Sequence, residues 1–244
     1  APPQAVQALF ERTAPTGLRH GTVTVLSGGR TLEVTTYRTE GAYSDHRRPD
    51  SVRFTGDLAA DLSRRDFTIN AMAMGPEGDI TDPFGGREDI ARRLIRCVGE
   101  PERRFGEDAL RMLRALRFSA QLGFAIEPGT YAAIERLAPT ASALSAERVR
   151  DEFLKALSSP CPETAYGMLA LGLMASFARA EGPPPALSSL PAYARLAHLC
   201  FELERRGYIA STEGFLTQLR LPRAEVRTAV RATAILCSGS RDYK

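Results

Sequence analysis

Hydrophobic and polar positions follow two different periods along this chain. Residues 20–38, "HGTVTVLSGGRTLEVTTYR", alternate between the two kinds on both sides of Ser-Gly-Gly, which predicts a β-hairpin with one buried face. Glu33 falls on the opposite face. "INAMAMGPEGDITDPFGG" (69–86) predicts a second, shorter hairpin, and "REDIARR" after it predicts a helix. The buried face of the first hairpin is expected to carry Val23, Val25, Leu32, Val34 and Thr36.

From Pro101 onward, apolar positions recur at helical spacing. "TEGAYSDHRRPDSVRFTGD" (39–57) shows neither period and predicts a long loop, a kind of segment that often carries function. The fold class is therefore predicted to be α+β, with a mixed N-terminal portion followed by an all-helical portion. The expected helices cover 103–122, 128–137, 145–157, 162–176, 190–207 and 211–219.

The segment "EDALRMLRALRF" (107–118) predicts a helix with two unlike faces. At about 100° per residue, Asp108, Arg111, Arg114 and Arg117 sweep about half of the circumference, and apolar side chains fill the other half. One interpretation is a solvated face on which Asp108 pairs with Arg111. The other is a surface that reads a nucleobase, because aspartate accepts from an exocyclic amine and arginine donates to a ring acceptor. Such a pair would select cytosine and adenine.

Composition and charge restrict the function only weakly. The formal net charge is +3, and 30 of the 32 basic residues are arginine, so an arginine-rich stretch is informative only through its spacing. The four cysteines are far apart and form neither a disulfide framework nor a zinc motif. "APPQAVQALF" lacks the pattern of a secretory signal, and no apolar run is long enough to span a bilayer. These observations predict a cytoplasmic protein without a membrane partner.

Two further segments contain candidate chemistry. "RRDFTINAMAM" (64–74) places Arg65 and Asp66 beside a buried stretch, where arginine suits a triphosphate and Asp66 or Asn70 suits sugar hydroxyls. The alternative is a capped turn with solvated arginines. In "SAERVRDEFLKAL" (145–157), the charged residues are expected to brace helices by ion pairs: Glu147, Arg148 and Glu152.

The order and spacing of these segments resemble the class II tRNA nucleotidyltransferase and bacterial poly(A) polymerase family. The resemblance covers about residues 4–157 and rests on "TLEVTTYR", "YSDHRRP", "RRDFTINAMAM", "DPFGGREDIARRLIRCVGEPERRFGEDALRMLRALRFSAQLGF" and "AERVRDEFLKAL". It implies a polymerase-β-like nucleotidyltransferase head, incomplete at its N-terminus, followed by an all-helical neck and body. The expected divisions are 1–100 for the head, 101–157 for the neck with its base-recognition helix, and 158–244 for the body and the start of a tail.

The resemblance also implies a function and a site. The expected activity is template-independent addition of A, and also of C, from ATP and CTP to the 3′ end of tRNA. Arg65 is expected to contact phosphate, Asp66 the ribose, and Asp108 with Arg111 the base, with Arg114 and Arg117 completing the strip. The intact segment 38–54 favours a CCA-adding or A-adding enzyme, and a poly(A) polymerase is the alternative. The oligomeric state stays open.

The family's metal-binding D-x-D pair is expected just ahead of "APPQAVQALF", and these 244 residues do not contain it. Glu33 matches a strand carboxylate of the family and is the candidate third acidic group near Mg²⁺, although one carboxylate cannot hold two such ions. Three interpretations follow: an active enzyme trimmed at its N-terminus, a non-catalytic relative that binds nucleotide or RNA, or an enzyme completed by a segment in trans.

Overall fold

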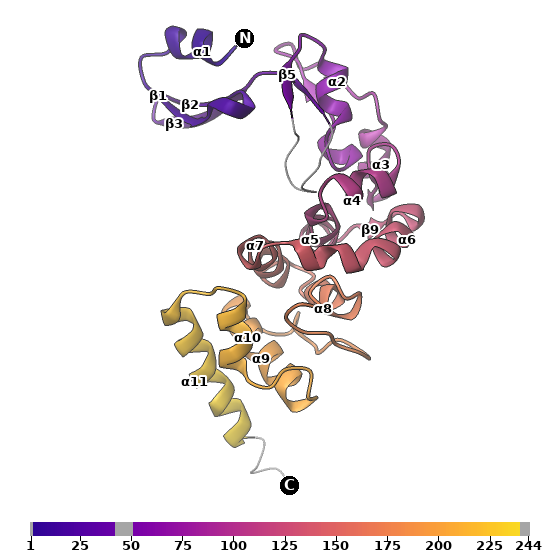
Figure 1. Cartoon of the computed structure of the whole chain (residues 1–244), viewed down its shortest axis with the longest axis vertical. Helices are drawn as coiled ribbons and strands as arrows, with labels where there is room; N and C mark the ends of the chain where they lie inside the picture. The colour runs from indigo at the N-terminus through magenta and orange to yellow at the C-terminus, as the bar shows by residue number, and fades with distance from the viewer. Residues whose placement is uncertain (1, 42–50, 240–244) are drawn as a thin grey trace.

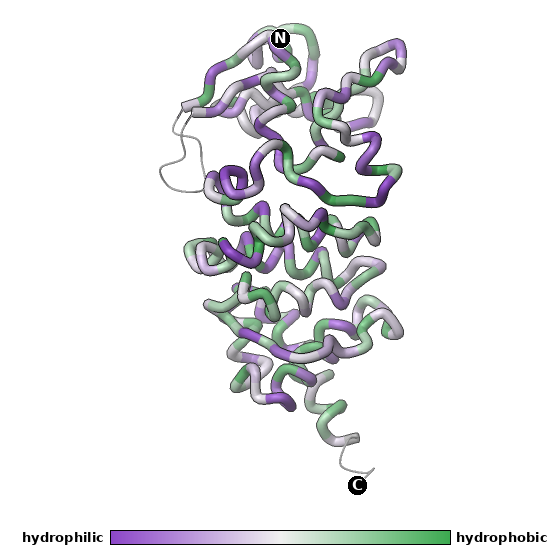
Figure 2. The backbone as a smooth tube through the Cα atoms, turned by 90° about the vertical axis from the view of Figure 1, so that its right-hand side faces the viewer, coloured by the Kyte–Doolittle hydropathy of each residue, from purple (hydrophilic) through white to green (hydrophobic). Residues whose placement is uncertain are grey.

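The protein is an elongated column of stacked elements, with its first and last helices at opposite ends (Figures 1 and 2). This computed structural model describes residues 2–41 and 51–239. Of the predicted loop 39–57, residues 42–50 therefore lie outside the described part. Most strands lie toward the N-terminal end of the column, together with short helices, and the remainder is mainly helical, which confirms the predicted α+β class.

The first predicted hairpin is confirmed. β2 pairs antiparallel with β3, with Val23 opposite Val34, and the connecting Gly28 and Gly29 both have a positive φ, as a tight two-residue turn requires. Val23 and Val25 are buried against Val6 of the first helix. Leu32, which was expected to be buried, is 50% exposed, so the burial prediction is wrong at this position. The elements here are α1 (Pro3–Leu9), β1 (Thr13–Gly17), η1 (Leu18–His20), β2 (Thr22–Ser27) and β3 (Arg30–Thr35).

The segment after the hairpin contains short paired strands and short helices. The prediction of a long loop over 39–57 is wrong at both ends, because β4 and β5 are strands that pair antiparallel. The second predicted hairpin and the helix after it are confirmed. The elements are β4 (Arg38–Glu40), β5 (Val52–Phe54), α2 (Leu58–Ser63), η2 (Thr68–Asn70), β6 (Ala73–Met74), β7 (Ile80–Thr81) and α3 (Gly86–Arg92).

The predicted single helix 103–122 is two helices, α4 (Pro101–Glu107) and α5 (Leu110–Leu122). Asp108 lies between them with an extended backbone, and its carboxylate accepts a hydrogen bond from Leu110 N at 3.0 Å. A local side-chain bond of this kind competes with the helical pattern and starts a new helix. The parallel pair β8 (Leu94–Ile95) and β9 (Ala125–Ile126) flanks these helices in sequence.

The remaining predicted helices form with small changes at their ends. Helix 162–176 is shorter than predicted, because Gly172 adopts a positive φ of 76° soon after α8 ends. α11 was not predicted. No helix in residues 2–41 and 51–239 combines the length and the apolar composition needed to cross a bilayer. The elements are α6 (Pro128–Leu137), η3 (Ala138–Ala143), α7 (Ala146–Leu157), α8 (Glu163–Ala170), α9 (Ala192–Arg205), α10 (Thr212–Gln218) and α11 (Arg223–Gly239).

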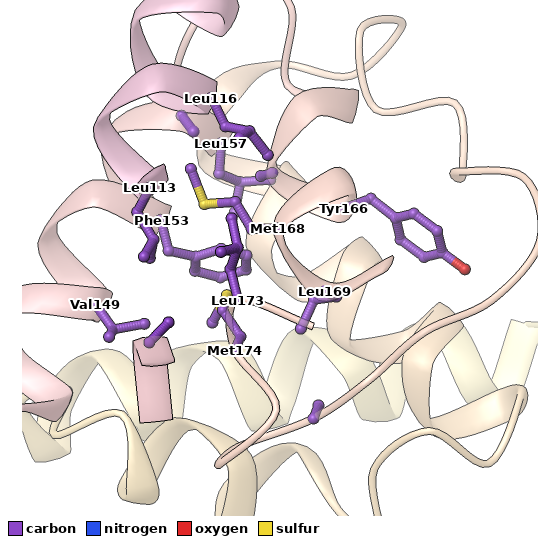
Figure 3. Packing of buried hydrophobic residues seen from close by; sticks show 14 of the residues in the cluster. Leu113, Leu116, Val149, Phe153, Leu157, Tyr166, Met168, Leu169, Leu173 and Met174 are labelled. Atoms are coloured by element: carbon purple, nitrogen blue, oxygen red, sulfur yellow. The ribbon is translucent and has the colours of Figure 1, made fainter. Parts of the chain in front are cut away.

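The largest hydrophobic cluster joins the helices into one core. Leu113 and Leu116 of α5 meet Phe153 of α7 and Met168 of α8 (Figure 3). The same cluster reaches from Phe67 to Ala229, so it takes residues from all three predicted divisions of the chain. The divisions at 100 and 157 stay a prediction.

Asp82 in "DPFGG" joins the second hairpin to α3, because its carboxylate accepts from Gly86 N at 2.8 Å and from Arg87 N at 2.9 Å. Partial burial raises the pKa of Asp82, but these backbone hydrogen bonds outweigh it and hold the pKa below its usual value. The stabilisation is present above the unfolded-state pKa of about 3.9 and is lost as the pH falls through the lower pKa of the folded state.

We predict that Asp82→Ala lowers the free energy of unfolding by about 1 kcal/mol at pH 7, as loss of a capping carboxylate does. Urea unfolding measured from pH 7 down to pH 3 checks this. The difference in the free energy of unfolding between the variant and wild type should become smaller below about pH 4. Glu77→Ala, an exposed change in the nearby turn, is the control and should be close to neutral.

Candidate functional site

A cleft of about 620 Å³ brings together side chains from the first hairpin, the segment 64–70, and the starts of α5 and α7. Six of the eight predicted site residues line it, whereas Glu33 and Arg117 do not. These segments are far apart in sequence and meet where the strand-containing end of the column joins the helices (Figure 1). The predicted residues in the cleft are Arg65, Asp66, Asn70, Asp108, Arg111 and Arg114.

The lining of the cleft is strongly cationic. Six arginines line it together with two aspartates, and this excess of positive charge suits a polyanion such as a nucleoside triphosphate. Sequence reasoning did not place Arg38 or Arg148 in the site, because nothing in a linear pattern shows which segments meet. The lining residues that were not predicted are Thr22, Thr35, Arg38, Arg64, Leu110 and Arg148.

Asp61 of α2 positions the two arginines that follow this helix. Its Oδ1 accepts from Arg64 Nη2 at 2.8 Å and from Arg38 N at 3.0 Å, and its Oδ2 lies 3.5 Å from Arg65 Nη2. Burial alone would raise the pKa of Asp61. The hydrogen bonds from Arg64 and Arg38 and the nearby guanidinium charges lower it by more than burial raises it, so the pKa lies below its usual value. Asp61 is therefore a carboxylate anchor, and the Arg65 side chain beside it is 43% exposed at the cleft.

Asp66 connects the segment after α2 to α5. Its Oδ2 accepts from Arg114 Nε at 2.7 Å and Nη2 at 2.6 Å, and its Oδ1 accepts from Phe67 N at 3.0 Å. Asn70 Nδ2 lies 3.5 Å from the same Oδ1. The carboxylate is thus held in one orientation, next to the amide that was predicted to share its role.

Asp108 enters the cleft because it lies at the break between α4 and α5. Its Oδ2 accepts from Arg148 Nη2 of α7 at 2.6 Å, while Oδ1 accepts from Leu110 N. The predicted helix-bracing role of Arg148 is confirmed by this pair. The alternative Asp108–Arg111 pair is not formed, since Arg111 is paired elsewhere.

The expectation of an open cationic strip along α5 is wrong for two of its members. Arg111 is only 9% exposed and donates to Glu107 Oε2 at 2.5 Å, to Arg104 O at 3.1 Å and to Arg64 O at 3.4 Å. Arg117 is 7% exposed. Both are covered because neighbouring segments pack over that side of the helix.

Arg117 pairs with Glu152 of α7 and also donates to Gln121 Oε1 at 2.6 Å. Its guanidinium lies 3.7 Å from the centre of the Phe118 ring. The bracing role predicted for Glu152 is confirmed, and Arg117 holds two helices together away from the cleft.

Glu33 is exposed on β3, on the same face of the hairpin as Thr35, which lines the cleft. Among the described residues, no group of three or more His, Cys, Asp or Glu side chains could hold a metal ion. A magnesium site needs several oxygen ligands. These residues therefore do not fit a complete Mg²⁺ site, and the role of Glu33 stays a prediction.

Two family models match this chain. The poly A polymerase head domain matches residues 1–96, and the "probable RNA and SrmB-binding site of polymerase A" matches residues 123–178. The CCA-adding enzyme of Geobacillus stearothermophilus is 45% identical over 93% of this chain and 58% of its own length. The chain belongs to the class II tRNA nucleotidyltransferase and poly(A) polymerase family.

Other members of the family agree with this assignment. The CCA-adding enzyme of Leuconostoc citreum (strain KM20) is 55% identical over 64% of this chain and 38% of its own length. The structure of the Bacillus stearothermophilus CCA-adding enzyme in complex with CTP matches with a TM-score of 0.81 and 37% identity, over 98% of this chain and 60% of that one. This confirms the polymerase-type head followed by helices. The chain spans less than two thirds of the length of these family members.

We predict that Glu152→Ala lowers the free energy of unfolding by about 3 kcal/mol, because it leaves the buried guanidinium of Arg117 without its carboxylate. Asp151→Ala is the matched control on the same helix. It removes an exposed carboxylate paired with Arg150 and should cost less than about 1 kcal/mol. Equal losses in chemical denaturation of the two variants would contradict the structural role of the buried pair.

Proposed function

We propose that this chain is the nucleotide-selecting part of a template-independent nucleotidyltransferase that adds C and A to the 3′ end of tRNA. The observation that carries the proposal is the convergence of Arg65, Asp66, Asp108 and Arg111 on one cationic cleft. The sequence relatives described above are CCA-adding enzymes. The proposed reaction is attack of an RNA 3′ hydroxyl on the α-phosphate of CTP or ATP, with pyrophosphate as the leaving group.

The residues after α2 bind the triphosphate and the sugar in this proposal. Arg65 can contact phosphate oxygens because it is partly exposed and makes only long contacts, 3.3 Å to Asn70 O and 3.5 Å to Asp61 Oδ2. Asp66 and Asn70 offer an acceptor and an amide to the ribose hydroxyls. Arg114, held on Asp66, lies where it can also contact the nucleotide. Mg²⁺ is the expected cofactor of the whole reaction, and these residues act by binding and orienting the nucleotide.

The base is read by Asp108 and Arg111 in this proposal. A carboxylate has about four acceptor positions, and Asp108 uses two of them for Leu110 N and Arg148. The remaining positions can accept the exocyclic amine of C or A, which U and G do not present in that place. Arg111 donates to the ring acceptor when the base replaces one of its present partners. Arg117, which was expected to complete the strip, has a structural role instead.

The alternatives within this proposal differ in product. An A-adding enzyme incorporates A alone, a poly(A) polymerase makes long A tails on unrelated RNA, and a non-catalytic relative binds nucleotide without turnover. The full-length protein that contains this chain should extend tRNA lacking its 3′ end with both C and A. Incubation with each nucleotide singly and together, with product lengths read on a sequencing gel, separates these outcomes, and long homopolymer tails would contradict CCA addition.

We predict that Asp108→Ala lowers the selectivity among the four bases more than it weakens the binding of nucleoside triphosphates. The preference for ATP and CTP over GTP and UTP should fall at least about fivefold, because one base-reading contact contributes about 1–3 kcal/mol of discrimination. The Kd values of all four triphosphates, measured by competition, check this without requiring turnover. Arg65→Ala is the matched variant and should weaken the binding of all four triphosphates by the same factor. Unchanged preference in Asp108→Ala would refute the base-reading role.

A further inference from the structure

The first hairpin brings two neutral hydroxyl groups to the cleft that the proposed function does not use. Thr22 of β2 lies directly opposite Thr35 of β3, and both residues line the cleft. Their side-chain oxygens are 3.0 Å apart and share one hydrogen bond. Thr35 is exposed and Thr22 is half-buried, so a ligand in the cleft can reach the pair.

The shared hydrogen bond leaves part of the hydrogen-bonding capacity of this pair unused. Each threonine hydroxyl has one hydrogen and two lone pairs. Whichever hydroxyl donates, the accepting one keeps its own hydrogen, and among the described residues neither side-chain oxygen has another partner. The pair can therefore donate to a ligand and accept from it at the same time. That combination suits a ligand hydroxyl, which both donates and accepts, better than it suits an anion, which only accepts.

A second threonine pair on the same sheet has a structural role only. Thr16 Oγ1 lies 2.7 Å from Thr24 Oγ1, Thr24 is 9% exposed, and neither residue lines the cleft. Threonine pairs between neighbouring strands stabilise antiparallel sheets. Thr22 and Thr35 differ from this second pair by their position, because they share the cleft with the residues proposed to hold the nucleotide.

The hairpin side of the cleft is left for the RNA. In the proposed function, the triphosphate, ribose and base of the incoming nucleotide bind to side chains from residues 64–70 and 108–114. In phosphoryl transfer the attacking and leaving oxygens are roughly in line, so the RNA 3′ hydroxyl approaches the α-phosphate from the side away from the pyrophosphate. Thr22 and Thr35 are the two lining residues that the hairpin contributes, and neither carries a charge that would bind the triphosphate.

We propose that the pair of Thr22 and Thr35 binds the ribose of the 3′-terminal nucleotide of the RNA through its 2′ hydroxyl. A ribose 2′ hydroxyl is both a donor and an acceptor, and it distinguishes RNA from DNA. The contact positions the sugar whose 3′ hydroxyl attacks. Thr22 and Thr35 are then binding residues for the acceptor RNA, separate from the residues that select the nucleotide. This inference rests on the proposed function and names a contact with its second substrate.

The test is the double variant Thr22→Val with Thr35→Val, in the full-length protein that contains this chain. Valine suits a strand, and removing both partners of a hydrogen bond together leaves neither of them unsatisfied, so the fold should be kept. The probes are two RNA minihelices with an unpaired 3′ end, identical except that one has a 2′-deoxy sugar in its last nucleotide. Wild type should bind the all-ribose probe about fivefold more tightly than the deoxy probe, and the double variant should bind both with equal Kd.

The matched control is Thr16→Val with Thr24→Val, which removes the other hydroxyl pair of the same sheet. It should keep the difference between the two probes, and the Kd for ATP should be unchanged in both double variants. A difference between the probes that persists in the Thr22 and Thr35 variant would overturn the inference, and so would equal binding of the two probes by wild type. A raised Kd for ATP in this variant would overturn it as well, because the pair would then contact the incoming nucleotide.

The binding measurements require no turnover, so they separate this inference from the proposed function. A wild-type protein that prefers the all-ribose probe through the pair but does not extend it supports the contact and refutes the enzymatic proposal. A wild-type protein that extends the minihelix, with the Thr22 and Thr35 variant showing the same preference between the probes, refutes the contact and leaves the enzymatic proposal standing.

Discussion

Arg111 and Arg117 of α5 can lie inside the protein only because carboxylates from neighbouring segments pair with them. Arg117 is paired with Glu152 of α7, and Arg111 with Glu107 of α4. A buried guanidinium without a partner would cost several kcal/mol, which is a large part of the stability of a domain of this size. The helices next to α5 are therefore held in the one arrangement that supplies these carboxylates.

That arrangement also builds the cleft. With Glu152 held on Arg117, the preceding turn of α7 carries Arg148 to Asp108. Across the cleft, Arg114 holds Asp66 of the segment after α2. The acceptors proposed for ribose and base are thus oriented before a nucleotide binds, so binding costs less side-chain conformational entropy.

The described residues include groups suited to binding a nucleotide but not the ligands of a metal ion. They provide guanidinium, carboxylate and amide groups from four segments around one cleft, and these are the groups to which we assign nucleotide binding and selection in the proposed function. They do not provide the cluster of oxygen ligands that a metal ion needs.

Local pattern alone determined the first hairpin and most of the helices, because periodicity is a property of neighbouring residues. The family followed from the resemblance of the motifs, in their order, to a known family. Pattern and resemblance together identified six residues of the cleft. They did not show that α5 begins only after Asp108, that Arg111 and Arg117 are buried, or that Arg148 reaches Asp108. Those features depend on which segments pack together, since an arginine on a helix is exposed or buried according to whether another segment brings a carboxylate to cover it.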